Sequence, residues 1–185
     1  MITLTKYKNT PLLGFAAYSG TGKTTLLEQL IPALKHININ IALVKHTHHE
    51  KFDIDRPGKD SYRLRKAGAQ QVLVASAKRW ALMVEHPGEQ IKSKPEPNLY
   101  ELITHLDLNK IDLILVEGFK HETMSKIELH RPQLEKPLLH PHDPDIIAIA
   151  SNEMQLEHYY PDQIQCPVLD LNNINEITKF IQQHL

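Results

Sequence analysis

A glycine-rich stretch between an apolar run and a helical pattern constrains this chain more than any other feature of its sequence. Residues 17–24 read AYSGTGKT, after the apolar run 11–17 and at the start of an amphipathic pattern over 23–36. They fit the phosphate-loop pattern G-x-x-x-x-G-K-[ST] at every position but the first, where Ala17 replaces glycine. Glycines let backbone N–H groups turn around an anionic oxygen, and a helix start adds partial positive charge. The sequence therefore predicts a nucleotide phosphate site.

The predicted site includes a magnesium ion, which needs oxygen ligands. The Thr24 hydroxyl is one ligand, and Lys23 would reach the β- and γ-phosphates. Asp112 lies near the start of the apolar run 111–116 and Glu117 directly follows it, about 16 Å away on an extended strand. Ligands bind beyond the carboxyl ends of parallel strands, so Glu117 is the predicted acid.

Two further details follow from the direction of this strand. Gly118 would bring a backbone N–H to a γ-phosphate. Residues 109–112 match the guanine-reading pattern N-K-x-D, but they precede the strand and are rejected for that role. A base-reading loop should instead follow the apolar run 145–150, where Asn152 or Glu153 would reach a base edge.

Apolar runs alternate with helical patterns along the whole chain. The expected strands are 11–17, 39–45, 111–116, 145–150 and, more weakly, 167–171. The expected helices are 23–36, 60–67, 98–108 and 173–184, with Pro32 predicted to kink the first or end it early. Short apolar runs that alternate with helices predict an α/β fold. We expect a mostly parallel sheet with helices on both faces, of the P-loop NTPase type.

Residues 71–86 (QVLVASAKRWALMVEH) interrupt this alternation, because no helix-length insert separates two β-like runs. They predict a projecting β-hairpin that presents Trp80, Leu82 and Met83. Two interpretations stay open: an ordinary edge hairpin, or a contact in a dimer.

Composition limits the class of protein. The chain has 185 residues, of which 41% are hydrophobic and 23% charged, and we expect a single domain over 1–185. Cys166 is the one cysteine, and neither a signal peptide nor an apolar run of membrane-spanning length is present in the sequence. We therefore expect a cytoplasmic protein without a membrane partner. The net charge of −1 gives no basic excess, which argues against a nucleic-acid partner.

A histidine-rich segment follows the second predicted strand. Residues 45–50 read KHTHHE, and Asp53 and Asp55 come directly after. A zinc site is one interpretation, but we favour a switch segment that γ-phosphate and Mg²⁺ would order, because it follows a strand beside the phosphate loop. The predicted switch or partner residues are His46, His48, Asp53, Asp55, Lys59, Asp60 and Gly118.

Taken together, these motifs resemble the MobB family, molybdopterin-guanine dinucleotide biosynthesis protein B. The matching blocks are FAAYSGTGKTTLL (15–27), LVKHTHHEKFDIDRPGKDSYRLRKAGA (43–69), RWALM (79–83) and DLILVEGFKHE (112–122). The resemblance implies a GTP-binding adapter with Mg²⁺ and at most slow GTPase activity. It also implies a homodimer and, as partner, the guanylyltransferase that joins GMP to molybdopterin, a reaction this chain would not itself catalyse.

The resemblance also assigns residues. The phosphate contacts it implies are Ser19, Gly20, Thr21, Gly22, Lys23, Thr24 and Thr25. It places the strand-end acid at Glu117 and base-binding positions at Ser151 and Asn152.

Two other functions share parts of this pattern. One is a P-loop small-molecule kinase or ATP-dependent ligase; the other is a histidine-rich metal carrier. Kinases usually add an arginine-rich lid, but Arg131 is the one arginine after residue 80, which favours the adapter. Phe119 and Lys120, rather than a water-orienting glutamine, follow Gly118, so we expect slow hydrolysis.

Overall fold

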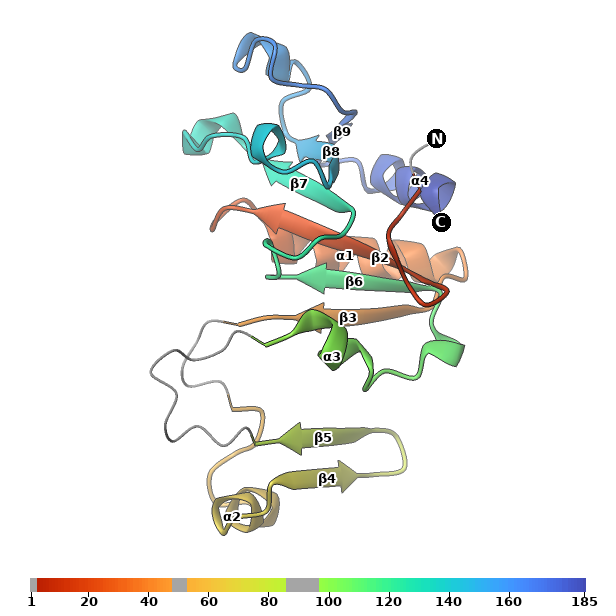
Figure 1. The fold of residues 1–185 in the computed structure, drawn as a ribbon, viewed down its shortest axis with the longest axis vertical. Coiled ribbons are helices and arrows are strands. Elements are labelled where there is room, and N and C mark those ends of the chain that lie inside the picture. The colour runs from red at the N-terminus through yellow and green to blue at the C-terminus, as the bar shows by residue number, and fades with distance from the viewer. Residues whose placement is uncertain (1–2, 48–52, 86–96) are drawn as a thin grey trace. The chain divides into compact units, whose positions relative to one another are not determined.

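The structure, a computed structural model, describes residues 3–47, 53–85 and 97–185. The chain divides into two compact units, of which Met1–His46 and Pro97–Leu185 form the first and Thr47–Glu96 the second (Figure 1). Each unit is described by itself below. The single domain expected over 1–185 stays a prediction.

A mostly parallel sheet forms the centre of the first unit. Its parallel strands lie in the order β3 (Ile41–Lys45), β6 (Leu113–Glu117), β2 (Thr10–Ala17), β7 (Lys126–His130), β8 (Ile146–Ser151) and β9 (Val168–Asp170) (Figure 1). The short β1 (Lys6–Tyr7) pairs antiparallel with β2. All six parallel strands end at the same edge, so the segments that follow them converge there. The predicted α/β fold is confirmed.

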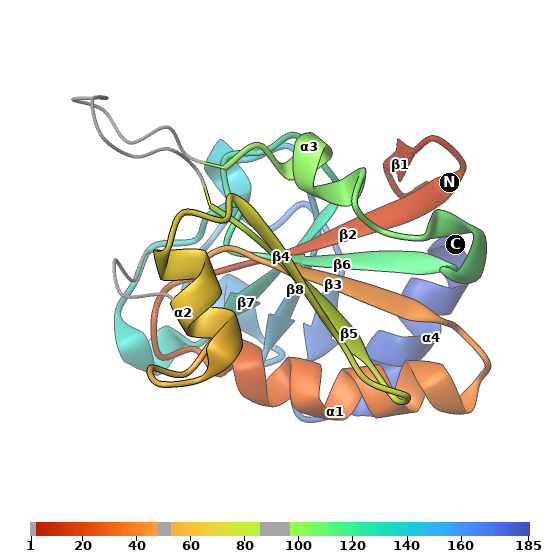
Figure 2. The ribbon, with the colours of Figure 1, turned by 90° about the horizontal axis from the view of Figure 1, so that it is seen from below.

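Helices cover both faces of this sheet (Figure 2). Alternate residues of β2 point to opposite faces, so Leu13 and Phe15 join one core cluster and Leu12 joins another. Helices α1 (Lys23–His36) and α4 (Ile174–His184) pack on the first cluster, and α3 (Leu99–Ile103) packs on the second. Helix α1 continues through Pro32, so the expected early end is wrong.

Besides the two-residue β1, sequence analysis also did not predict strand β7 in the middle of the sheet. It is buried on both faces: Ile127 and Leu129 join the first core cluster, and the polar residues of the other face, Lys126, Glu128 and His130, are also at most 2% exposed. Each has a partner far along the chain: the Lys126 ammonium lies 2.9 Å from Asp143, and His130 Nε2 lies 2.9 Å from the Tyr160 hydroxyl. The alternation of polar and apolar residues in KIELH is thus a strand signal that was missed, whereas the burial of its polar face depends on partners that no local pattern contains.

Glu128 also holds a loop in place. Its carboxylate accepts hydrogen bonds from the backbone N–H groups of Leu139 and His140, at 2.9 and 2.8 Å. Burial raises the pKa of Glu128 to about 7. The loop after β7 contains two short 3₁₀ helices, η2 (Pro132–Leu134) and η3 (His140–His142).

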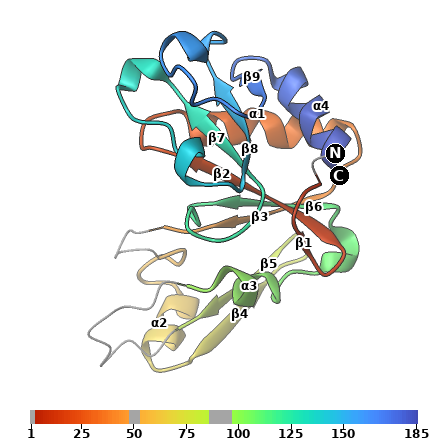
Figure 3. The same cartoon turned by 45° about the horizontal axis from the view of Figure 1, so that its top comes forward.

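The remaining short elements refine the expected boundaries. The helix expected over 98–108 is shorter, because α3 ends at Ile103 and a separate 3₁₀ helix η1 (Leu108–Lys110) follows. A further 3₁₀ helix, η4 (Leu156–His158), precedes β9. The first and last segments of the chain meet, since the Leu4 N–H donates to the His184 carbonyl at 3.4 Å (Figure 3). Within the described part of the chain, no helix has the length and apolar character to cross a membrane.

The second unit contains helix α2 (Asp60–Lys66) and the antiparallel strands β4 (Gln71–Ala75) and β5 (Trp80–Val84). The predicted hairpin is confirmed, and Trp80 and Leu82 are exposed on it, but the expected exposure of Met83 is wrong, because Met83 lies on the opposite face and is partly buried. One face of the hairpin presents large apolar side chains to solvent. They are Leu73, Trp80, Leu82 and Val84, and we call them the hairpin face.

Candidate functional site

The glycine-rich loop joins β2 to α1 at the carboxyl edge of the sheet. Gly20 and Gly22 have φ angles of 84° and 95°, the left-handed region that glycine adopts without steric cost. The Thr21 side chain is buried, and its hydroxyl donates to the Tyr18 carbonyl at 2.9 Å. The loop thus has a fixed internal structure.

The start of α1 offers free hydrogen-bond donors. Gly22 is its N-cap and supplies no side-chain acceptor, and the first turn contains no acidic residue. The first N–H groups of a helix need an acceptor from outside the helix. Lys23 is partly buried here, whereas Thr24 and Thr25 are exposed, as are Ser19 and Gly20 in the loop. All seven predicted phosphate contacts therefore lie on one short segment whose donors fit an anion.

Glu117 lies on the neighbouring strand at the same edge. It ends β6, is 8% exposed, and its carboxylate lies 3.1 Å from the Lys45 ammonium at the end of β3. In the absence of another cation, Lys45 thus neutralises the acid that was predicted to bind Mg²⁺. Asp112 lies at the opposite end of β6 and accepts hydrogen bonds from Asn40. Residues 109–110, part of the rejected N-K-x-D match, also precede β6.

Gly118 connects this acid to the segment after β3. Its φ angle is 92°, and a Cβ placed on it would lie 2.9 Å from the His46 carbonyl oxygen. The His46 N–H donates to the Glu117 carbonyl at 2.8 Å, and its ring lies 5.3 Å from that of Phe119. The two segments therefore approach each other closely because residue 118 has no side chain.

Arg131 is a site residue that sequence reasoning missed. It follows β7, the strand beside β2, and its Nε–H donates to the Thr21 carbonyl in the phosphate loop at 2.9 Å. Its place could have been found only if the segment KIELHR had been recognised as a strand end.

The predicted base-binding residues end β8 at the same edge. Ser151 is fully buried, and its hydroxyl accepts from the Glu153 N–H at 3.0 Å. Asn152 donates from Nδ2 to the Gln133 side chain at 3.1 Å, while its Oδ1 is buried with no hydrogen-bond partner in the described part of the chain. Asn152 is thus the better placed of the two to accept a hydrogen bond from a ligand.

A cavity of about 340 Å³ opens beside the end of β2. Its lining includes Lys120, His121, Lys126 and two aspartates that pair with Lys126. The positive charge of buried Lys126 is therefore already neutralised by these two aspartates. Among residues 3–47, 53–85 and 97–185, no group of three or more His, Cys, Asp or Glu side chains is arranged to hold a metal ion.

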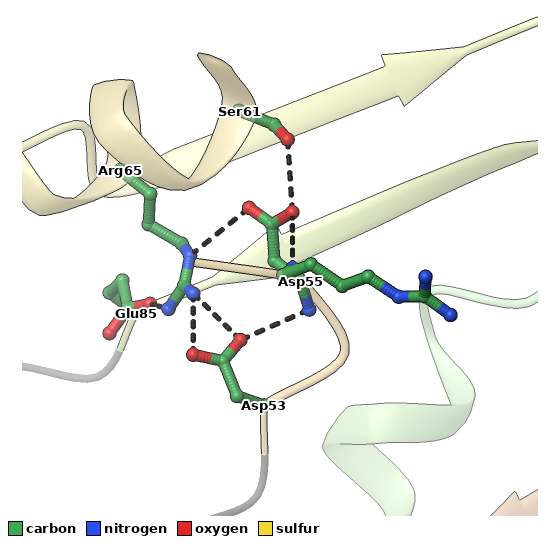
Figure 4. Close-up of polar contacts among 6 residues, drawn as sticks. Asp53, Asp55, Ser61, Arg65 and Glu85 are labelled. Atoms are coloured by element: carbon green, nitrogen blue, oxygen red, sulfur yellow. Dashed lines mark hydrogen bonds and ion pairs between the residues drawn. The ribbon is translucent and has the colours of Figure 1, made fainter. Parts of the chain in front are cut away.

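The predicted switch residues Asp53 and Asp55 belong to the second unit, where they surround Arg65 (Figure 4). Arg65 donates from Nη2 to both Asp53 carboxylate oxygens, at 2.7 and 2.8 Å, and from Nη1 to Glu85. The hydrogen bonds from Arg65 hold the pKa of Asp53 below its usual value. Asp55 lies 4.0 Å from Arg65 Nε and accepts from the Ser61 hydroxyl. Both aspartates thus have a structural role within their own unit.

The other predicted switch residues divide between three places. Lys59 is the N-cap of α2 and Asp60 begins that helix, both in the second unit. His46 ends the first segment of the first unit, whereas His48 lies outside the described residues. The switch role of these residues stays a prediction.

Comparison with known proteins identifies the family. The sequence profile of MobB, "Molybdopterin guanine dinucleotide synthesis protein B", matches residues 12–152.

The chain belongs to the MobB family.

Two relatives support this membership over nearly their whole length. A protein of Escherichia coli K12 named "Molybdopterin-guanine dinucleotide biosynthesis adapter protein" is 49% identical over 177 residues, which are 92% of this chain and 91% of the relative. A protein of Haemophilus influenzae with the same name is 44% identical over 175 residues, covering 95% and 89%.

Solved MobB structures share the fold. "Crystal Structure of molybdopterin-guanine biosynthesis protein B (mobB)" superimposes with a TM-score of 0.65 at 21% identity, covering 94% of this chain and 99% of the other. "The Crystal structure of Bacillus subtilis MobB" gives 0.65 and 21%, covering 95% and 98%. The MobB profile ends at residue 152, so it spans the phosphate loop, Glu117, Arg131 and Asn152.

Proposed function

We propose that this MobB-family chain is a GTP-binding adapter that assists synthesis of the molybdopterin guanine dinucleotide form of the molybdenum cofactor. The names of the E. coli and H. influenzae relatives support the adapter role. The observation that carries nucleotide binding is the uncapped N-terminus of α1, which follows two left-handed glycines and lies at the same sheet edge as Glu117.

The phosphate groups would meet the backbone N–H groups of the loop and the Lys23 ammonium. Thr24 and Glu117 would hold Mg²⁺, because a hydroxyl and a carboxylate are oxygen ligands of the kind this ion prefers. The ion would neutralise phosphate charge. Lys45 now neutralises Glu117 at 3.1 Å, so Mg²⁺ and Lys45 compete for one carboxylate. We expect Mg²⁺ to bind tightly only together with a nucleotide, whose phosphate oxygens add ligands.

We further propose that hydrolysis of GTP is slow. A fast GTPase positions a water-orienting side chain near the γ-phosphate. Here Phe119 follows Gly118, is 7% exposed and packs against His46, and Lys120 is exposed. Neither side chain supplies the amide that orients water in fast GTPases.

An adapter acts through its surfaces, and the hairpin face supports a homodimer. Trp80 and Leu73 on this face are 65% and 62% exposed, although they are large apolar side chains. Exposed apolar groups of this size mark protein contacts. We propose that this face forms the homodimer, that the other partner is the molybdenum cofactor guanylyltransferase, and that both act in the cytoplasm.

A kinase or ATP-dependent ligase remains the alternative to be tested. The scarcity of arginine in the second half of the chain argued against it, but the structure places Arg131 against the phosphate loop. That scarcity therefore no longer separates the two functions, and nucleotide preference must do so.

Calorimetric titration with GTP, GDP and ATP, each with and without Mg²⁺, tests the proposal. We expect GTP to bind more tightly with Mg²⁺ and more tightly than ATP. Lys23→Ala should lose phosphate-dependent binding while its melting temperature stays near that of the wild type. A preference for ATP would replace the adapter proposal by the kinase or ligase, and unchanged GTP affinity in Lys23→Ala would refute the phosphate site.

A further inference from the structure

We infer that Arg131 is a positioning residue of the phosphate loop, which sets the direction of one backbone donor and adds charge for a di- or triphosphate group. This inference rests on the nucleotide binding proposed above and deepens it. Its basis is a contact between two segments more than a hundred residues apart in the sequence: Arg131 Nε donates to the Thr21 carbonyl at 2.9 Å.

The contact fixes a peptide plane. Thr21 and Gly22 share one peptide group, and in a trans peptide the C=O and N–H bonds point in opposite directions. With the Thr21 carbonyl held by the guanidinium, the Gly22 N–H must point away from Arg131. Arg131 Nη2 lies 3.6 Å from the position of a Cβ on Gly22, so the guanidinium lies against this peptide. Without the contact, the peptide between Thr21 and Gly22 could turn to other directions, because a glycine tolerates many backbone angles besides its φ of 95° here.

Arg131 is itself held firmly. It directly follows β7, a central strand whose side chains are buried, and its carbonyl accepts from the Leu134 N–H at 3.0 Å. Pro132 is buried, and the Gln133 side chain accepts from Asn152 at 3.1 Å. The segment 131–133 therefore connects the phosphate loop to the end of β8, and Arg131 has a rigid backbone from which to act.

The charges near α1 point to the class of ligand. Arg131 and Lys23 both lie at the N-terminus of α1, which already carries partial positive charge. Among the described residues no carboxylate forms an ion pair with Arg131, and the first turn of α1 contains no acid. The two cations repel each other and the partial positive charge of the helix N-terminus, unless an anion lies between them. A ligand with several negative charges, such as a nucleoside di- or triphosphate, would relieve this repulsion.

The test compares four variants of the full chain by calorimetry with Mg²⁺-GTP and with inorganic pyrophosphate, which carries no base. Arg131→Ala should weaken binding of both ligands by about 10- to 100-fold, because the Gly22 N–H loses its fixed direction and the site loses one positive charge. Arg131→Lys keeps the charge but loses the Nε–H, so its affinity should fall between those of Arg131→Ala and the wild type. Lys35→Ala removes one positive charge from the last turn of α1 and should change neither affinity. Lys23→Ala serves as the variant without phosphate binding.

The outcomes separate this inference from the proposed function. Wild-type affinity in Arg131→Ala, together with lost binding in Lys23→Ala, would overturn the role of Arg131 alone. A loss for GTP without a loss for pyrophosphate would also overturn it, because the arginine would then act on the base. If the wild type binds neither ligand, the proposed function fails and the inference fails with it. If Arg131→Ala does not fold, Arg131→Lys decides: affinity equal to the wild type would refute the positioning role.

Discussion

Replacement of Gly118 by alanine should destabilise the first unit through a steric conflict that the structure locates. The added Cβ would lie 2.9 Å from the His46 carbonyl oxygen and 3.0 Å from the His46 Cβ. Both are atoms of a segment fixed by the hydrogen bond from the His46 N–H to the Glu117 carbonyl. The neighbouring backbone must therefore move.

The size of the effect is the sum of two costs and one smaller gain. A residue with a Cβ at φ 92° costs roughly 1–2 kcal/mol relative to glycine. Forcing a methyl group into a filled space costs about 1–3 kcal/mol more. Alanine recovers about 0.4–1 kcal/mol by restricting the unfolded chain. The net cost is about 1–5 kcal/mol, so we expect Gly118→Ala to lower the free energy of unfolding by about 3 kcal/mol.

Gly20→Ala provides a matched control within the same unit. Its φ angle is 84°, close to that of Gly118, but no atom lies within 4 Å of the added Cβ. It should therefore show the backbone cost alone, about 1 kcal/mol.

Urea unfolding without nucleotide measures both variants. With a slope of about 1–3 kcal/mol per molar urea, the extra steric cost should separate the two midpoints by about 1 M. Equal midpoints for Gly118→Ala and Gly20→Ala would refute the argument, because they would show that the strand ends adjust without cost.

Three further outcomes are expected. Burial raises the pKa of Glu128 from an ordinary 4.5 to about 7, so the folded state favours the neutral acid and loses up to about 3 kcal/mol of stability as the pH rises from 4.5 to 7. In Glu128→Gln this decline of the urea midpoint should disappear, and a decline parallel to the wild type would contradict the assignment. Arg65→Met should speed proteolysis within residues 47–96 while leaving the first unit intact. Arg63→Met, which removes an exposed arginine, should not speed it. Equal proteolysis rates for the two variants would show that the Arg65 contacts do not stabilise the second unit. Trp80→Ser should convert the proposed dimer into a monomer, measured by sedimentation velocity. Ile54→Ser changes an equally exposed side chain outside the hairpin face and should leave the dimer intact. A dimer that survives Trp80→Ser would place the interface elsewhere.

The parts of the fold that sequence reasoning predicted are those in which neighbouring residues decide the structure. The phosphate loop, with its preceding strand and following helix, is specified by adjacent glycines and one apolar stripe. The hairpin follows from two β-like runs, 71–75 and 80–84, whose connection is too short to contain a helix.

The parts that it missed depend on partners distant in the sequence. Strand β7 alternates polar and apolar residues like a half-buried strand, but its polar residues are buried too, because Lys126 meets Asp143 and His130 meets Tyr160, and no local pattern contains these pairs. Since β7 was not expected, the place of Arg131 at its end could not be predicted either. Helix α3 was predicted too long for a local reason: the Thr104 hydroxyl donates to the Glu101 carbonyl at 2.6 Å, at the residue where the helix ends.

The strand order has a consequence for how a new copy of this protein is made. Strand β2 is synthesised early, but its parallel neighbours, β6 and β7, leave the ribosome about 100 residues later, which at 5–20 residues per second is roughly 5–20 s. During this interval Leu12, Leu13 and Phe15 lack the neighbouring strands whose side chains later help to bury them, so part of the apolar surface of the nascent chain stays exposed. The hairpin β4–β5 needs no later residue and can fold first. The phosphate loop is among the first segments made, but Arg131, which donates to its Thr21 carbonyl, is synthesised more than a hundred residues later.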